Sequence, residues 1–211
     1  MLRAEPQEQV TTFGGRSIGY DERVLTPRAW TEAQSLWARE LLDDLPPGPV
    51  LEICAGAGHI GLLAVAGTDR ALVQVDADLT ACTWASRNAR TWGVDSDIRH
   101  GRMSEAVELD ERFALVLADP PYLPSGDVSR FPQDPLTAID GGDDGLDLAR
   151  ECLDVISRHL VRGGVALLQL RDEDQGRALA DDADARGLVI AESRQFDGGA
   201  VVLLRRATEG R

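Results

Sequence analysis

Short runs of consecutive apolar residues recur along the chain and alternate with longer amphipathic segments. The runs are PVLEIC from Pro49, ALVQVD from Ala71, ALVLAD from Ala114, GVALLQL from Gly164 and GAVVLLR from Gly199. Continuous apolar runs of this length are typical of strands that are buried on both faces of a sheet. The pattern therefore predicts a central sheet that is covered on both sides.

Segments of helical length separate these strands, and two weaker strands accompany them. A strand that alternates with a helix implies parallel strands joined by right-handed crossovers, which is a doubly wound α/β fold. Counting the weaker strands, the sheet has about seven strands, mostly parallel, in a Rossmann-like arrangement. The predicted helices span residues 59–67, 79–92, 146–161 and 173–185, and the weaker strands lie at 97–100 and 187–192.

The chain before the first apolar run has a different pattern. Residues 11–25 alternate around Gly14-Gly15, which predicts a hairpin, and residues from Trp30 to Leu42 have helical spacing. The sequence Asp44-Leu45-Pro46-Pro47-Gly48 ends that helix. We therefore predict a hairpin-and-helix cap over residues 1–45 and one larger domain over residues 46–211.

Composition and charge narrow the class of protein. The 211 residues include 22 basic residues, all arginine, against 36 acidic ones, and the net charge is −14. This charge disfavours nucleic acid as a partner. No apolar stretch is long enough for a membrane span and no signal peptide is visible, so a cytoplasmic protein is expected. The three cysteines and three histidines lack ligand spacing, so no metal site is predicted.

A glycine-containing turn follows the first central strand. The turn runs from Ala55 through Gly56 and Gly58 into a helix, and Asp76 ends the next strand. Small residues at such a turn let a ligand approach the backbone, and an acid at the second strand end can accept hydrogen bonds from ribose hydroxyls. Because Glu52 adds negative charge and Cys54 replaces the first glycine, the turn suits the cationic S-adenosylmethionine better than a pyrophosphate cofactor.

The tetrapeptide Asp119-Pro120-Pro121-Tyr122 ends the strand ALVLAD at the carboxyl edge of the sheet. Two prolines fix the backbone and present carbonyl groups without N–H groups, so this segment offers hydrogen-bond acceptors. An acid followed by such a carbonyl can hold both hydrogens of a planar –NH2 group and stabilise the positive charge that develops on its nitrogen. Tyr122 adds an aromatic wall.

These residues resemble the class I S-adenosylmethionine-dependent methyltransferases, and among them the HemK/PrmC-type protein-(glutamine-N5) methyltransferases. Four stretches carry the resemblance, and each is similar to a family motif: VLIPRPETE, VLDLGTGSG, NPPYI and ALDGGEDGL. In this chain they are VLTPRAWTE at residues 24–32, VLEICAGAG at 50–58, DPPYL at 119–123 and AIDGGDDGL at 138–146.

The resemblance implies a site for each part of the reaction. The turn would embrace the methionine part of the cofactor, Asp76 its ribose and Met103 its adenine, while Arg28 and Thr31 would line the entrance. Asp119, Pro120, Pro121 and Tyr122 would be the catalytic segment that binds the acceptor. The expected cofactor contacts are Glu52, Cys54, Ala55, Gly56, Gly58, Asp76, Ala77, Met103 and Asp119.

The sequence departs from the family pattern at several positions, so more than one class of methyl acceptor is considered. Asp119 stands where the family has Asn, and amino methyltransferases that act on adenine or guanine use an acid there. Arg102 stands where an Asp contacts the adenine, and the family's helical domain that docks the release factor has no counterpart ahead of the fold. A release-factor-like protein glutamine is the first choice. The alternatives are a nucleic-acid base, a small molecule, or cofactor binding without catalysis.

Overall fold

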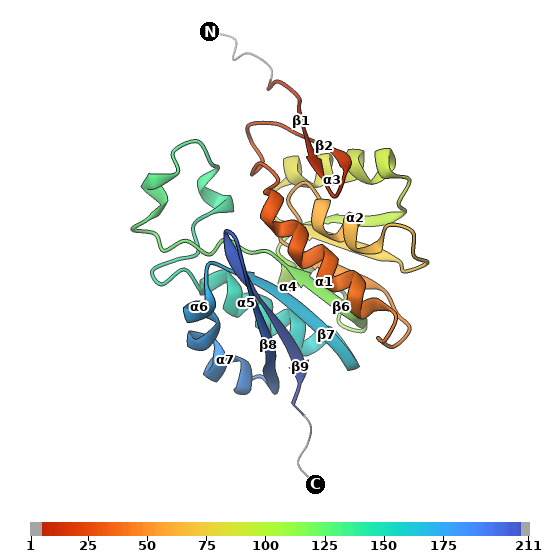
Figure 1. Ribbon diagram of the computed structural model, residues 1–211, viewed down its shortest axis with the longest axis vertical. Helices are drawn as coiled ribbons and strands as arrows, with labels where there is room; N and C mark the ends of the chain where they lie inside the picture. Colours follow the sequence, from red (N-terminus) through yellow and green to blue (C-terminus); the bar gives the residue numbers. More distant parts are fainter. Residues whose placement is uncertain (1–5, 208–211) are drawn as a thin grey trace.

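The computed structural model describes residues 6–207, and its centre is a seven-stranded sheet (Figure 1). The outer ends of the two predicted domains, residues 1–5 and 208–211, lie outside the described range. The strand order is β5-β4-β3-β6-β7-β9-β8; the first five strands are parallel, and β9 is antiparallel to both its neighbours. The strands are β3 (Val50–Ile53), β4 (Leu72–Asp76), β5 (Ser96–His100), β6 (Phe113–Ala118), β7 (Leu160–Leu170), β8 (Leu188–Phe196) and β9 (Gly199–Arg206).

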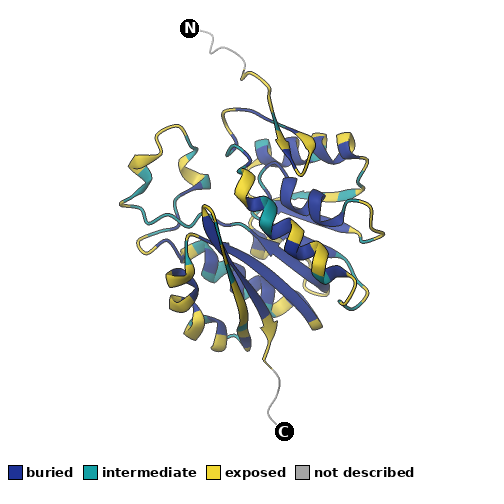
Figure 2. Cartoon of the chain, in the orientation of Figure 1, coloured by how far each residue is buried: buried dark blue, intermediate teal, exposed yellow. Residues whose placement is uncertain are grey.

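Helices cover both faces of this sheet, and the alternate side chains of each strand divide between two cores. Leu115 and Leu117 of β6 join the core beneath the first group of helices, and Val116 and Ala118 join the core beneath the second. The five central strands are accordingly buried along most of their length, whereas the edge strands β5 and β8 are largely exposed or half-buried (Figure 2). The first group is α1 (Glu32–Leu42), α2 (His59–Val65) and α3 (Leu79–Trp92); the second is α4 (Met103–Ala106), α5 (Asp147–His159), α6 (Glu173–Ala178) and α7 (Ala180–Asp184).

The predicted doubly wound fold is thus confirmed, with local differences. The segment 173–185 forms two short helices that are separated at Leu179, and Gly176 lowers the helix propensity of the first. The short helix α4 was not predicted. The segment between β6 and α5 projects from the body and carries only the 3-10 turns η2 (Val128–Arg130) and η3 (Leu136–Ala138) (Figure 1).

The apolar spacing predicted the first helix but only part of its buried face. Trp37 and Leu42 are buried, whereas Leu36 is half exposed and Trp30 lies in the preceding 3-10 turn η1 (Ala29–Thr31). The buried face instead includes Gln34 and Ser35. Both side chains donate hydrogen bonds to backbone carbonyls of the main fold, so polar residues occupy positions that a hydrophobic pattern assigns to solvent.

The predicted hairpin is β1 (Gln9–Phe13) and β2 (Arg16–Tyr20), joined at Gly14-Gly15. Asn88 of α3 fixes it to the main fold. Its side-chain carbonyl accepts from the N–H of Gly19 at 2.8 Å, and its amide donates to the carbonyls of Gly19 and Ala57 at 2.9 Å each. One buried side chain therefore joins the hairpin, α3 and the turn after β3. No described helix has the length and apolar character needed to cross a membrane.

Replacement of Asn88 by Ala is expected to lower the free energy of unfolding by about 2–4 kcal/mol, because three backbone groups lose a buried partner. Thr91→Ala, an exposed position on the same helix, is the matched control and should change stability by less than about 0.5 kcal/mol. Urea denaturation measures both values. Equal stability of the two variants would show that the hairpin does not depend on this contact.

Candidate active site

The register of three parallel strands brings the predicted site residues together. Ile53 of β3 pairs with Val75 of β4 on one side and with Ala118 of β6 on the other. The next residue on each strand is Cys54, Asp76 and Asp119, respectively. These residues therefore lie side by side at the carboxyl edge of the sheet, where ligands bind in open α/β folds.

The turn after β3 depends on left-handed backbone conformations. Cys54 has a φ of 57°, the only positive value among the non-glycine residues described, and Gly56 and Gly58 have φ of 53° and 79°. A side chain at Gly58 would clash with Gln74 and Ala85, so this glycine lets α3 approach the turn. Gly56 has open space beside it, which leaves its backbone accessible to a ligand.

Asp76 fixes the shape of this turn. Its two carboxylate oxygens accept from the N–H of Gly56 at 2.7 Å and from the N–H of Asp78 at 2.8 Å. Burial raises the pKa of Asp76 above its ordinary value, although these two hydrogen bonds oppose the shift. Each oxygen of a carboxylate has two acceptor sites, so both oxygens can still accept from a diol.

Glu52 lies beneath the turn and does not line the cavity described below. Gln74 donates a hydrogen bond to one of its oxygens at 2.5 Å and a second to the carbonyl of Gly58 at 2.9 Å. The other oxygen of Glu52 is buried and has no partner among the described residues. Burial raises the pKa of Glu52 to about 8, so this carboxyl group is largely uncharged at neutral pH.

Asp119 presents an unpaired acceptor at the end of β6. No described residue donates a hydrogen bond to its carboxylate, and burial alone raises its pKa to about 7. The two prolines that follow supply no N–H group, so the ladder of β6 ends here. Tyr122 lies farther along, beside Trp30 and Arg28, and burial raises the pKa of its phenol.

A cavity of about 550 Å³ opens at this edge of the sheet, a volume within the range of cofactor sites. Eight of the residues that the sequence predicted line it, and four do not. Glu52, Gly58, Pro120 and Tyr122 lie outside the lining; Thr31 of the predicted entrance is also absent, whereas Arg28 is present. The eight are Cys54, Ala55, Gly56, Asp76, Ala77, Met103, Asp119 and Pro121.

The lining also includes His59 and Glu151, which were not among the predicted site residues, and Arg102, which replaces the family's adenine-contacting Asp. His59 begins α2, and its ring packs edge-on against Phe13 and lies 3.5 Å from the hydroxyl of Thr31; burial lowers its pKa to about 3. Arg102 forms an ion pair at 3.3 Å with Glu151 of α5. Only the three-dimensional fold reveals these neighbours, because Arg102 and Glu151 are far apart in the chain.

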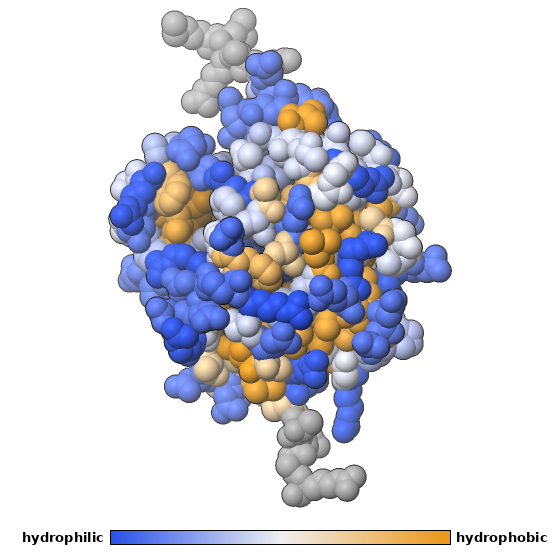
Figure 3. Space-filling view, in the orientation of Figure 1, coloured by the Kyte–Doolittle hydropathy of each residue, from blue (hydrophilic) through white to orange (hydrophobic). Residues whose placement is uncertain are grey.

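An ion pair joins the two sides of the cavity entrance. Arg28, which precedes α1, lies 2.6 Å from Asp134 in the projecting segment between β6 and α5. Pro135, Thr137 and Ala138 of the same segment line the cavity. Phe131 and Leu136 are partly exposed on it, and Figure 3 shows apolar surface on this projection. The entrance is thus formed by segments from both halves of the chain.

Three acidic side chains surround this edge of the sheet, and burial raises the pKa of each of them. A buried carboxyl group becomes easier to ionise when a positive charge lies close to it. The cavity is therefore suited to a ligand that carries positive charge and also has a diol for Asp76. Asp119 remains available as an acceptor for an N–H or O–H group.

Known proteins that are similar to this chain are methyltransferases. The model of the family described as "Methyltransferase small domain" matches residues 33–131. A ribosomal protein uL3 glutamine methyltransferase from Burkholderia pseudomallei is 30% identical over 181 residues, which cover 75% of this chain and 57% of that protein. A release factor glutamine methyltransferase from Deinococcus radiodurans is 34% identical over 163 residues, which cover 75% of this chain and 58% of that protein. The chain spans less than two thirds of the length of these relatives.

Solved structures show the same fold. One is a T. thermophilus 16S rRNA N2 G1207 methyltransferase in complex with AdoMet and guanosine. Its TM-score is 0.69 at 16% identity, and the match covers 98% of this chain and 52% of that structure's chain. A ribosomal protein L11 methylase from Lactobacillus delbrueckii has a TM-score of 0.66 at 13% identity and covers 88% of this chain and 82% of that chain.

Glu52→Gln is expected to stabilise the fold increasingly as pH rises. The folded protein holds the Glu52 proton up to about pH 8, whereas the unfolded chain releases it near the ordinary glutamate pKa of 4.5. The folded state therefore binds more protons between these values, and its stability falls with rising pH by up to about 1.4 kcal/mol per unit. Gln cannot titrate, so the difference between variant and wild type in urea denaturation should grow from pH 5 to pH 8. If the stability of variant and wild type changed with pH in parallel, the raised pKa of Glu52 in the folded protein would be contradicted.

Proposed function

Because the chain belongs to the class I S-adenosylmethionine-dependent methyltransferases and is similar to the HemK/PrmC-type enzymes, we propose that it methylates the side-chain amide of a protein glutamine. The observation that carries this proposal is the position of Asp119. Its unpaired carboxylate lies in the same cavity as the glycine turn and Asp76, at the start of a segment with two prolines. The relatives named as glutamine methyltransferases support the choice of acceptor.

The cofactor would occupy the cavity with its charged groups near the acids. Asp76 accepts hydrogen bonds from the ribose hydroxyls, Gly56 gives the methionine part access to the backbone, and Met103 packs against the adenine. S-adenosylmethionine supplies the methyl group as an electrophile on its sulfonium sulfur. The positive charge favours ionised Asp119, which counters the effect of burial on the pKa of this group.

The acceptor amide needs help because its nitrogen lone pair is delocalised into the carbonyl. Asp119 and the carbonyl of Pro120 accept the two N–H hydrogens and turn the lone pair toward the methyl group. As the nitrogen–carbon bond forms and the carbon–sulfur bond breaks, positive charge develops on the nitrogen. The carboxylate of Asp119 stabilises that charge and receives the proton that the methylated nitrogen then releases.

A nucleic-acid base is the second candidate acceptor, and Asp119 is the observation that favours it. An acid at this position is the variant that the amino methyltransferases of adenine and guanine use. The net charge of −14 opposes it, since a nucleic acid would be repelled by the protein as a whole. A protein acceptor requires no positive surface, and a translation factor would be encountered in the cytoplasm.

Recognition of the acceptor would fall to the segments around the entrance. We propose that residues 1–45 form the cap of residues 46–211 and that the projecting segment between β6 and α5 binds the chain around the glutamine. Arg28 and Asp134 join these two parts across the entrance. Phe131 and Leu136 supply exposed apolar contacts there.

A labelled-methyl assay distinguishes the acceptors. Purified protein is incubated with labelled S-adenosylmethionine and, in parallel, release factors, ribosomal protein, tRNA, rRNA and DNA. Label is expected in a protein glutamine, and Asp119→Ala should reduce its transfer at least about 100-fold while cofactor affinity stays within a few-fold. Label in nucleic acid alone would reject the glutamine proposal.

The pH dependence tests the role of Asp119. Because its pKa in the free protein is about 7 and the carboxylate is the useful acceptor, kcat/KM for the cofactor should rise from pH 6 to pH 8. Asp119→Asn keeps an acceptor oxygen but cannot titrate, so its activity should lie within about tenfold of wild type at pH 8 and lack this rise. An unchanged pH profile in the Asn variant would exclude Asp119 as the titrating group.

A further inference from the structure

Two buried glutamines hold the ends of the acceptor segment, and neither was part of the site predicted from the sequence. Gln34 contacts the carbonyl of Ala118, immediately before Asp119, and Gln175 contacts the carbonyl of Tyr122. They belong to α1 and α6, which cover opposite faces of the sheet. The four residues that would bind the acceptor are therefore bracketed by side-chain amides from two helices.

Gln34 is completely buried and donates two hydrogen bonds from one nitrogen. They reach the carbonyl of Ala118 at 3.0 Å and the carbonyl of Leu167 on β7 at 2.9 Å. Its own side-chain oxygen is buried and has no partner among the described residues. An unpaired buried acceptor destabilises a protein, so a residue that carries one calls for a role other than stability.

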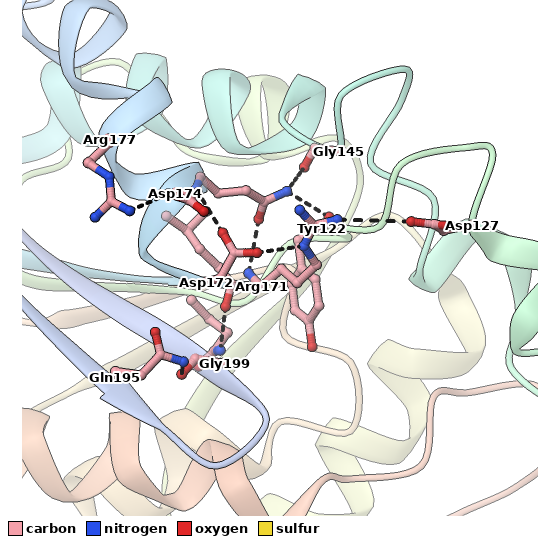
Figure 4. A network of polar contacts seen from close by, with 12 residues as sticks. Tyr122, Asp127, Gly145, Arg171, Asp172, Asp174, Arg177, Gln195 and Gly199 are labelled. Carbon is pink, nitrogen blue, oxygen red and sulfur yellow. Dashed lines mark hydrogen bonds and ion pairs between the residues drawn. The ribbon is translucent and has the colours of Figure 1, made fainter.

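Gln175 joins three segments at the other end, whose contacting residues Tyr122, Gly145 and Arg171 are labelled in Figure 4. Its nitrogen donates to the carbonyls of Tyr122 at 2.9 Å and Gly145 at 3.4 Å, and its oxygen accepts from the N–H of Arg171 at 2.9 Å. Gln175 is 4% exposed, so water does not replace these bonds easily. The acceptor segment is thereby tied both to α6 and to the loop that leads into α5.

The acceptor segment needs these contacts because its prolines cannot donate. A strand is normally held by N–H and carbonyl groups together, whereas here only carbonyls are available at the two proline positions. The neighbouring loop packs closely against the same segment, and a side chain at Gly141 would lie 2.7 Å from the carbonyl of Pro121. Donors at both ends therefore fix a segment that its own backbone cannot fix.

We infer that Gln34 and Gln175 are positioning residues that set the direction of the acceptor groups of Asp119 and Pro120 toward the transferred methyl group. The inference rests on the proposed function for its catalytic consequence. Neither glutamine touches the reacting atoms, and neither lines the cavity. Each acts through the backbone that it holds, and a displacement of about 1 Å is enough to slow such a reaction substantially.

The test compares three variants at Gln175 and Gln195. Gln175→Met keeps the side-chain volume and removes the donor, so kcat should fall about 10- to 100-fold while the Kd for S-adenosylmethionine stays within about twofold. Gln175→Glu retains a donor only when protonated, so its rate relative to wild type should decline as pH rises. Gln195→Met is the matched control, since Gln195 also donates to two backbone carbonyls but lies in the β8–β9 hairpin, and its rate should equal wild type.

Hydrogen exchange supplies a readout that does not require an acceptor. The N–H groups of Leu123, Ser125 and Gly141 connect the acceptor segment to the neighbouring loop. They should exchange faster in Gln175→Met and in Gln34→Met than in wild type or Gln195→Met. Unchanged exchange in Gln175→Met and Gln34→Met would overturn the inference. If the wild type methylates glutamine, an unchanged kcat in Gln175→Met would overturn it as well. A wild type that transfers no methyl group to glutamine would instead reject the proposed function, and the exchange rates would still decide the inference.

Discussion

The pairing register of β3 with its two neighbours is the constraint on which the site depends. Ile53 is level with both Val75 and Ala118, so the chain leaves all three strands at the same height. A shift of one residue in either pairing would turn Asp76 or Asp119 to the opposite face of the sheet. The two cores fix this register, because alternate residues of every central strand are buried against different helices.

This arrangement places acidic groups where water is largely excluded. Glu52, Asp76 and Asp119 all have raised pKa values, and burial is the largest cause in each. A cationic ligand bound beside these carboxyl groups would lower their pKa values and so favour their ionised form. Glu52 stabilises the turn in its uncharged form, whereas Asp119 keeps an unpaired carboxylate at the cavity. Glu52 and Asp119 thus have different roles, because their surroundings in the fold differ.

The sequence was sufficient to predict the order of strands and helices along the chain and eight of the residues that line the cavity. Continuous apolar runs located the central strands, and the acids at their ends followed from the geometry of parallel sheets. The sequence could not show that Glu52 turns beneath the loop, because its direction depends on which face of β3 meets α2. The missed contacts of Gln34, His59 and Glu151 arise from packing between distant segments. Polar residues buried by such contacts look like surface residues in a hydrophobic pattern.

A crystal structure tests most directly where the acceptor nitrogen lies. The protein would be crystallised with S-adenosylhomocysteine and a glutamine-containing peptide taken from a protein that it methylates. We expect the glutamine amide nitrogen within hydrogen-bonding distance of both the Asp119 carboxylate and the Pro120 carbonyl, facing the cofactor sulfur. A glutamine bound elsewhere in the cavity, with Asp119 contacting the cofactor alone, would contradict it.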